Sequence, residues 1–390
     1  MTFRESEDYL LGLELFGMRF GLDRMHKLMT ALGMPQRRFA QVHVVGSNGK
    51  SSTTRFIAAI LQRHGLRTGS YTSPHLSSFR ERIEVGEEAV SGERFAAAVE
   101  RAAQAAAMVE RTLDPDDGVT QFEALTAAAY HELAASRVEV AVIEAGLGGR
   151  YDATNVIPSR VQVLTGVGLE HTRWLGPTLV VGPDLQPEIR VVAERVASER
   201  GASLITAQSA PGSFQQRNFA LAVAAADAVL DSALDADAVT RAAAETRIPG
   251  RLEVVADRPL ILHDGAHNPA GARALAAALP DILAGRSPLV LVASVLEDKD
   301  VAGMLEALLP LAGHVVFTRC ANPRALSPGT LESLSAKLGG PATETVAGPR
   351  DAVARARGIA GPGGAVLATG SIYLIADLVR EASQSRASAL

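Results

Sequence analysis

The stretch GSNGKSS, residues 46–52, stands between a short β-rich run, Gln41–Val45, and a segment with helical spacing, Ser51–Arg63. Its glycines permit a tight turn, and the N–H groups at the start of a helix attract an anion. The lysine would reach the β- and γ-phosphates of a nucleotide, and a serine hydroxyl would approach the metal held by those phosphates. The common P-loop pattern has glycine where this chain has Val44, and an ordinary glycine-rich turn is the alternative interpretation. Gly-Lys-Ser-Ser at a strand-to-helix junction favours the phosphate-binding loop.

Polar side chains follow three further strand-like runs. Ser73, Glu144 and His171 stand at or just beyond the ends of residues 67–72, 138–144 and 161–167, respectively. Ligands of open α/β sheets bind beyond the carboxyl ends of the strands, so these side chains are expected to lie together. Taken singly, a Ser-Pro pair is more often only a turn and a lone histidine is more often structural. The three strand ends together favour a shared site for Mg²⁺, which prefers oxygen ligands.

Strand-like and helical segments alternate along the whole chain, which predicts α/β architecture with mostly parallel sheets in both halves. Its 390 residues exceed the roughly 100–200 residues of one typical domain. The Pro-Gly pair within Ile248–Arg251 marks a boundary, because it interrupts helices and strands alike. We therefore expect a first domain of residues 1–248, a linker of residues 249–258 and a second domain of residues 259–390.

Composition narrows the classes of function. Apolar residues make up 47% of the chain, enough for sizeable cores, and the net charge of −5 argues against nucleic acid as the main partner. Residues 1–8 lack the features of a signal peptide, and no run of about 18 apolar residues predicts a membrane span. Cys320 is the only cysteine, which fits a reducing cytoplasm.

The second half carries a polar motif of its own, DGAHNP, residues 264–269, directly after its first predicted strand. Asn268 would cap a helix that begins at Pro269. Asp264 and His267 have no such structural role, and we expect them to face the first domain across a cleft.

Taken together, these segments resemble the folylpolyglutamate synthase and dihydrofolate synthase family, within the Mur-ligase-like ATP-dependent amide ligases. The resemblance covers nearly the whole chain and depends on motifs in a fixed order. They are FGMRFGLDRMHKLMTALGMP, HVVGSNGKSST, YTSPHLSSFRERI, VIEAGLGGRYDATNV, GLEHTRWLG, PGRLEVV, DGAHNP, VLEDKD, TRCANPRALSP and TGSIYL. The resemblance implies a P-loop-containing, Mur-ligase-like first domain with a mostly parallel sheet and a smaller, Rossmann-like C-terminal α/β domain.

The same resemblance implies ATP-dependent ligation of L-glutamate to dihydropteroate, to a (tetrahydro)folate or to both, in folate biosynthesis. ATP would phosphorylate a carboxylate of the acceptor, and the amine of glutamate would attack the acyl phosphate. Catalysis would then be mainly positioning and charge neutralisation, by Lys50 and Mg²⁺. The partners implied are these small molecules, with no nucleic acid and no membrane, and we expect a cytoplasmic monomer.

Residues are carried over from the resemblance one position at a time. The ATP-binding set comprises Gly46, Ser47, Asn48, Gly49, Lys50, Ser51, Ser52, Asn218, Arg251 and Asp264. The metal ligands are Ser73, Glu144 and His171, and the catalytic residues are Lys50, Glu144 and His171. The substrate set comprises Phe122, Asp152 and Ala153 on the pterin side, with His267 and Ser371 on the glutamate side.

One departure from the family pattern is severe. After Thr178 the family normally continues through a helical segment whose lysine is carbamylated and supplies oxygens to a metal. Here Thr178 runs directly into Leu179, and no lysine occurs between Ser51 and Asp298. Either the protein has a further internal segment, or the deletion is real and the metal cluster is incomplete. We favour the first explanation, because mobile loops concentrate at functional sites.

Three hypotheses about function stay open at this point. The leading one is the folate-type glutamate ligase. The second is a Mur-like ligase with another carboxylate acceptor, and the third is a nucleotide- or folate-binding protein that has lost ligation.

Overall fold

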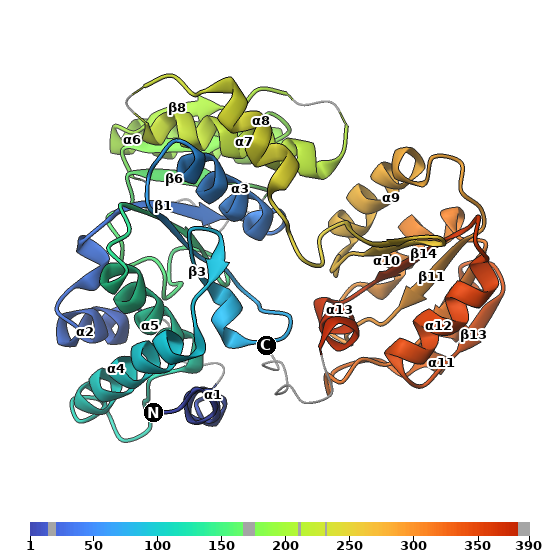
Figure 1. The fold of residues 1–390 in the computed structure, drawn as a ribbon, viewed down its shortest axis with the longest axis horizontal. Coiled ribbons are helices and arrows are strands. Elements are labelled where there is room, and N and C mark those ends of the chain that lie inside the picture. The colour runs from blue at the N-terminus through green and yellow to red at the C-terminus, as the bar shows by residue number, and fades with distance from the viewer. Residues whose placement is uncertain (15–20, 167–175, 210–211, 231, 381–390) are drawn as a thin grey trace.

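The computed structural model describes residues 1–14, 21–166, 176–209, 212–230 and 232–380. These residues form two sheets, each flanked by helices, and the two units lie beside one another (Figure 1). The fold is therefore mixed α/β, as the alternation of segments predicted. Among the described residues, no helix combines the length and the apolar character that a membrane span requires.

The first sheet has eight strands in the order β4-β3-β2-β5-β1-β6-β7-β8. Their bounds are β1 Ala40–Val45, β2 Thr68–Tyr71, β3 Ile83–Val85, β4 Glu88–Ala89, β5 Val140–Glu144, β6 Val161–Leu164, β7 Thr178–Val181 and β8 Ser203–Thr206. All neighbours pair in parallel except the hairpin pairs β2–β3 and β3–β4. The central strands β1, β2 and β5 therefore end at one edge, where the phosphate loop begins.

Two helical layers cover the first sheet (Figure 1). The helices are α1 Phe3–Gly12, α2 Asp23–Ala31, α3 Lys50–Arg63, α4 Gly92–Glu110, α5 Gln121–Ala135, α6 Pro187–Arg200, α7 Phe214–Val229 and α8 Ala236–Glu245. Side chains alternate along β5, so that Val140 and Val142 pack with α3 and α7 while Ala141 and Ile143 pack with α4 and α5. Burial on both faces explains why this strand is an uninterrupted apolar run that ends in Glu144.

The second sheet has six strands in the order β13-β12-β11-β14-β10-β9. Its elements are β9 Glu253–Asp257, β10 Leu260–His263, α9 Pro269–Leu283, β11 Leu289–Ala293, α10 Val301–Leu308, β12 His314–Phe317, α11 Pro328–Lys337, β13 Thr343–Thr345, α12 Pro349–Ala360, β14 Ala365–Thr369 and α13 Ile372–Val379. Strand β9 is antiparallel to β10 and forms the sheet edge. Residues 253–257, which fall inside the stretch expected as a linker, are thus a strand of the second sheet.

Candidate active site

The phosphate loop leads from β1 into α3, and α3 begins at Lys50 without a side-chain cap on its first turn. Uncapped N–H groups at a helix start are the groups that bind a phosphate. Gly49 has φ +83°, and a Cβ atom there would lie 2.4 Å from Asn218 Oδ1, so only glycine fits. The Lys50 ammonium donates to the Gly46 carbonyl at 2.9 Å and stays close to the loop.

Glu144 lies at the end of β5 beside this loop, and only 1% of it is exposed. Its Oε1 accepts from the Ser51 hydroxyl at 2.9 Å, and its Oε2 accepts from the Ser73 backbone N–H at 3.1 Å. Burial raises the pKa of Glu144, and the charge of Lys50 opposes that shift. The structure therefore brings the strand ends at Ser73 and Glu144 together with the phosphate loop.

These oxygen groups fit a Mg²⁺ ion, which keeps several waters and binds proteins through one or two carboxylates plus substrate phosphates. The described residues contain no group of three or more His, Cys, Asp or Glu side chains that could hold a metal without such help. Ser51, Ser73 and Glu144 would hold the ion. His171, the other predicted ligand, lies outside the described residues.

The chain closes the first sheet without the family's lysine segment. Thr178 pairs with Val161 at the start of β7, and the ladder continues to Val181, which pairs with Thr206 of β8. The connection from β6 to β7 includes residues 167–175, which lie outside the described residues, so a further internal segment and a real deletion both stay predictions.

The second domain presents Asp264 from the end of β10. Its carboxylate accepts from the backbone N–H groups of Leu252 and Ala266, each at 2.8 Å. Burial raises the pKa of Asp264, and the charge of Arg251 opposes that shift. Because both oxygens are fixed by backbone donors, the group is held rigidly at the wall of the cleft.

His267, three residues after Asp264, also lines the cavity. Its Nδ1 lies 2.9 Å from the Gly265 carbonyl, which can only accept, so Nδ1 carries the hydrogen. Burial lowers the pKa of His267 to about 4, so the ring is neutral near pH 7 and its Nε2 is an acceptor. Ser371 lies nearby at the start of α13, where its hydroxyl caps the helix by accepting from the Tyr373 N–H.

A direct contact joins the two domains at the phosphate loop. Asn268 Nδ2 donates to Asn48 Oδ1 at 3.0 Å, and Asn48 Nδ2 lies 3.4 Å from Asn268 Oδ1. Asn268 also caps α9, as predicted, by accepting from the Gly271 N–H. The contact ties the start of α9 to the loop that would hold the nucleotide.

The first domain contributes Phe122, Asp152 and Ala153 to the lining of the same cavity. A Cβ atom at Gly146 would lie 2.5 Å from the Phe122 ring, so glycine is needed where the loop after β5 crosses that ring. Asp152 Oδ2 accepts from the Leu147 N–H at 2.8 Å. The glycine-rich segment thus packs an aromatic ring and a fixed carboxylate into one corner.

One cavity of about 1110 Å³ joins all these groups. Of the predicted site residues, it is lined by Ser47, Asn48, Gly49, Lys50, Ser51, Ser52, Ser73, Phe122, Glu144, Asp152, Ala153, Asn218, Arg251, Asp264, His267 and Ser371. Gly46 adjoins it through its contact with Lys50. The cavity also has lining residues that were not among the predicted site residues, including Arg24, Lys299 and Arg324 within the quoted motifs and Thr120 and Glu123 outside them. Thr120 and Glu123 have the spacing of a helix capping box, which was a usable sequence signal.

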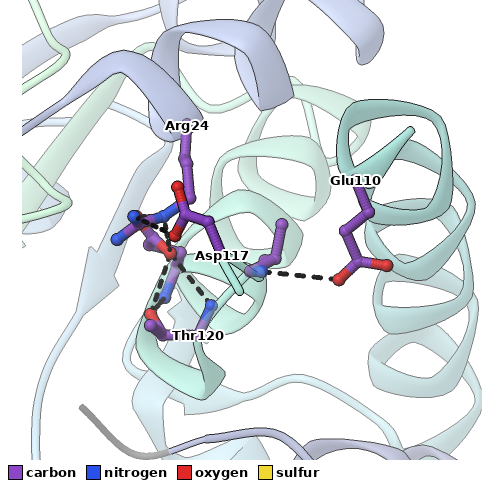
Figure 2. Close-up of polar contacts among 6 residues, drawn as sticks. Arg24, Glu110, Asp117 and Thr120 are labelled. Carbon is purple, nitrogen blue, oxygen red and sulfur yellow. Dashed lines mark hydrogen bonds and ion pairs between the residues drawn. The ribbon is translucent and has the colours of Figure 1, made fainter. Parts of the chain in front are cut away.

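Arg24, on α2, binds residues at the start of α5 (Figure 2), and α5 is also the helix that carries Phe122. Its Nε lies 3.0 and 3.1 Å from the two carboxylate oxygens of Glu123, and its Nη1 donates to Asp117 Oδ1 at 2.8 Å. Glu123 in turn accepts from the Thr120 N–H and hydroxyl. This buried ion network fixes the helix end that carries the aromatic wall of the cavity.

Removing the cation from this network is expected to destabilise the protein. Arg24→Met takes the cation away from the buried carboxylate of Glu123 and the half-buried carboxylate of Asp117, which should lower the free energy of unfolding by about 3 kcal/mol. Urea unfolding followed by circular dichroism measures it. Arg195→Met is the control, because its pair with Glu199 is 66% and 62% exposed, and a change of at most about 0.5 kcal/mol is expected there. Equal effects of the two substitutions would contradict the role of Arg24.

Comparison with known proteins identifies the family. A family model described as Mur ligase, glutamate ligase domain, matches residues 250–372. A dihydrofolate synthase/folylpolyglutamate synthase of Mycobacterium tuberculosis is 33% identical over 85% of this chain and 81% of that protein. A folylpolyglutamate synthase of Lacticaseibacillus casei is 32% identical over 98% of each chain. A probable bifunctional folylpolyglutamate synthase/dihydropteroate synthase of Haloferax volcanii is 32% identical over 97% of this chain, which spans 50% of that protein.

Solved structures of the same family also resemble this chain. Folylpolyglutamate synthase of Mycobacterium tuberculosis complexed with ADP has a TM-score of 0.86 and 31% identity, covering 96% of this chain and 97% of that chain. Escherichia coli FolC in complex with DHPP and ADP, and the Yersinia pestis bifunctional enzyme with AMPPNP and Mn ion, each have a TM-score of 0.82 and 26% identity, covering 97% of both chains. These matches confirm the resemblance and the fold class inferred from the motifs. The chain belongs to the dihydrofolate synthase/folylpolyglutamate synthase family of the Mur ligases.

Proposed function

We propose that this protein ligates L-glutamate to dihydropteroate, a folate or both, with ATP converted to ADP and phosphate. The observation that carries the proposal is the single cavity in which the phosphate loop, Glu144 and Asp264 meet the corner formed by Phe122 and Asp152. The ADP, DHPP and metal–nucleotide complexes of its structural relatives support the same chemistry. ATP and Mg²⁺ are the proposed cofactors.

In this mechanism the residues bind, orient and neutralise charge. The uncapped start of α3 and Lys50 hold the phosphates, with Asn218 beside the loop and with Arg251 and Asp264 on the facing domain. Ser51, Ser73 and Glu144 would hold Mg²⁺, which would supply positive charge beside the phosphates.

The acceptor would bind against residues of the first domain, and glutamate against residues of the second. Phe122, Asp152 and Ala153 would hold the acceptor so that its carboxylate meets the γ-phosphate. In the second domain, His267 Nε2 is an acceptor for an N–H of the attacking amine, and Lys299 and Arg324 bring positive charge for the carboxylates of glutamate. The Asn48–Asn268 contact keeps both domains at the phosphate loop.

The decisive measurement is ADP release by the purified protein. We expect ADP release when dihydropteroate, L-glutamate and Mg-ATP are all present. The rate of release should fall about tenfold or more when either the acceptor or glutamate is left out. Release that requires a different carboxylate would favour the Mur-like alternative. ATP binding without release under any acceptor would favour the binding-protein alternative, which the missing lysine segment keeps open. Comparing dihydropteroate with tetrahydrofolate as acceptor separates the two activities of the family.

We further propose that the protein works in the cytoplasm as a monomer, with small molecules as its partners and no nucleic acid. Its one cysteine, Cys320, is buried and cannot form an internal disulfide. Light scattering at micromolar concentration tests the monomer, and an intact mass above 40.8 kDa would reveal a further segment after Thr178.

A further inference from the structure

A buried series of hydrogen bonds connects strand β1 of the first sheet with Asp152, in the part of the cavity where the acceptor is proposed to bind. His43 on β1 and Thr154 are 1% and 0% exposed, and His43 Nε2 lies 2.9 Å from Thr154 Oγ1. Thr154 donates from its N–H, at 3.0 Å, and from its hydroxyl to Asp152 Oδ1. Asp152 lines the cavity, whereas His43 and Thr154 lie behind it.

The direction of each hydrogen bond follows from the groups involved. An ionised carboxylate only accepts, so the Thr154 hydroxyl gives its single hydrogen to Asp152. The hydroxyl can then only accept from the ring, which places the hydrogen of His43 on Nε2. Burial lowers the pKa of His43 to about 4, so the ring is neutral and its Nδ1 carries no hydrogen. Hydrogen bonds are therefore donated in one direction, from His43 to Thr154 and from Thr154 to Asp152. We call these three residues the relay.

The His43 ring carries an unpaired polar atom that lowers the stability of the fold. Its Nδ1 is buried and has no hydrogen-bond partner in the described structure. An apolar side chain, such as those of its strand neighbours Val42 and Val44, would avoid the cost of that unpaired atom. A core position that keeps a polar group at such a cost is expected to serve a functional site.

Asp152 is held from several sides at once. Besides the two donors of Thr154, the Leu147 N–H donates to its other oxygen at 2.8 Å. The buried Tyr130 hydroxyl donates to the Thr154 carbonyl at 2.8 Å, which fixes the backbone that presents the relay. Burial raises the pKa of Asp152, and the donors on Thr154 and Leu147 oppose that shift, so they stabilise the ionised form.

We propose that His43 and Thr154 are positioning residues for the acceptor, acting through Asp152. The relay orients the Asp152 carboxylate at the cavity and keeps it ionised there, so that Oδ2 can accept one further hydrogen bond, from an N–H of a planar heterocycle such as an amino-substituted pyrimidine ring. This inference rests on the proposed function, because it takes the acceptor to bind against Asp152. Neither His43 nor Thr154 touches the acceptor.

Thr154→Val and Thr154→Ser form the first test. Valine keeps the shape and removes the hydroxyl, so KM for dihydropteroate should rise about tenfold or more, as expected for a lost bond to a charged group. KM for ATP and kcat at saturating acceptor should change by less than about twofold, because the phosphate loop is untouched. Serine keeps the hydroxyl and should restore KM for the acceptor to within about twofold.

His43→Leu and His43→Gln form the second test, and they separate positioning from packing. Leucine removes the donor and should raise KM for dihydropteroate about threefold or more without lowering the melting temperature, since the unpaired Nδ1 is removed as well. Glutamine keeps an N–H within reach of Thr154 and should stay close to wild type. If the acceptor and ATP KM values rise together, or if leucine and glutamine behave alike, the relay is refuted.

Direct binding of dihydropteroate, measured by calorimetry, tests the proposed function and the relay separately. Acceptor binding without ADP release in the wild type contradicts the proposed function and leaves the relay testable through the dissociation constant. Unchanged acceptor binding in Thr154→Val contradicts the relay alone. A wild type that binds neither dihydropteroate nor tetrahydrofolate contradicts both.

Discussion

Lys50→Ala is expected to lower kcat by about 10³-fold or more, the scale found when a main charge-stabilising group is removed from a transferring phosphoryl group. Lys50 is the one lysine of the phosphate loop, and it lies at the start of α3 beside Glu144 and the cavity. Its ammonium donates to the Gly46 carbonyl at 2.9 Å, a partly buried contact within the loop that water can replace. The loss should therefore appear in turnover and not in folding, and steady-state ADP release at saturating substrates measures it.

Lys27→Ala is the matched control for that experiment. Lys27 belongs to the same domain, and its ammonium donates to the Thr112 carbonyl and hydroxyl on the outside of the helical layer. Its removal should change kcat by less than about twofold, as expected for an exposed contact. Circular dichroism of both variants should match the wild type. Substantial activity in Lys50→Ala would refute the assignment of the phosphate loop.

The site residues that could be predicted from the sequence are those whose motif lies within a short stretch of the chain. The phosphate loop shows itself through glycines and a lysine within seven residues, and the strand ends at Ser73 and Glu144 follow from apolar runs that stop at a polar residue. Because parallel strands end at one edge, their meeting could also be predicted. The hydrogen bonds of Glu144 with Ser51 and Ser73 confirm that expectation of proximity.

The parts that sequence did not predict depend on pairings between distant segments. Strand β7 is only four residues long and adjoins the point where the family pattern breaks, so it carried no periodic signal of its own. Arg24 meets Glu123 across 99 residues, and His43 meets Thr154 across 111. A buried arginine or histidine looks like any other in a sequence until the fold supplies its partner.

Glu144→Gln is expected to lower kcat by about 10²-fold or more, because the amide keeps the shape but loses the negative charge that would hold Mg²⁺. The hydrogen bonds can survive the change. The amide oxygen can accept from the Ser73 N–H, and the amide nitrogen can donate to the Ser51 hydroxyl, which can reverse its role. The substitution therefore separates metal binding from local structure. ADP release as a function of Mg²⁺ concentration measures it, and the variant should need more metal than the wild type.

Glu139→Gln, at an exposed position directly before the same strand, is the control and should leave the Mg²⁺ dependence unchanged. Stability gives a second, independent readout. The pKa of Glu144 is raised above its ordinary value by burial, so its ionised form destabilises the fold at neutral pH, and that cost disappears as pH falls through the folded pKa. The ligand-free variant should thus melt at or above the wild-type temperature at pH 7, with the difference shrinking at lower pH, whereas Mg-ATP should stabilise the wild type more. A variant that is both less stable and still metal-dependent like the wild type would mean that Glu144 serves the fold and not the metal.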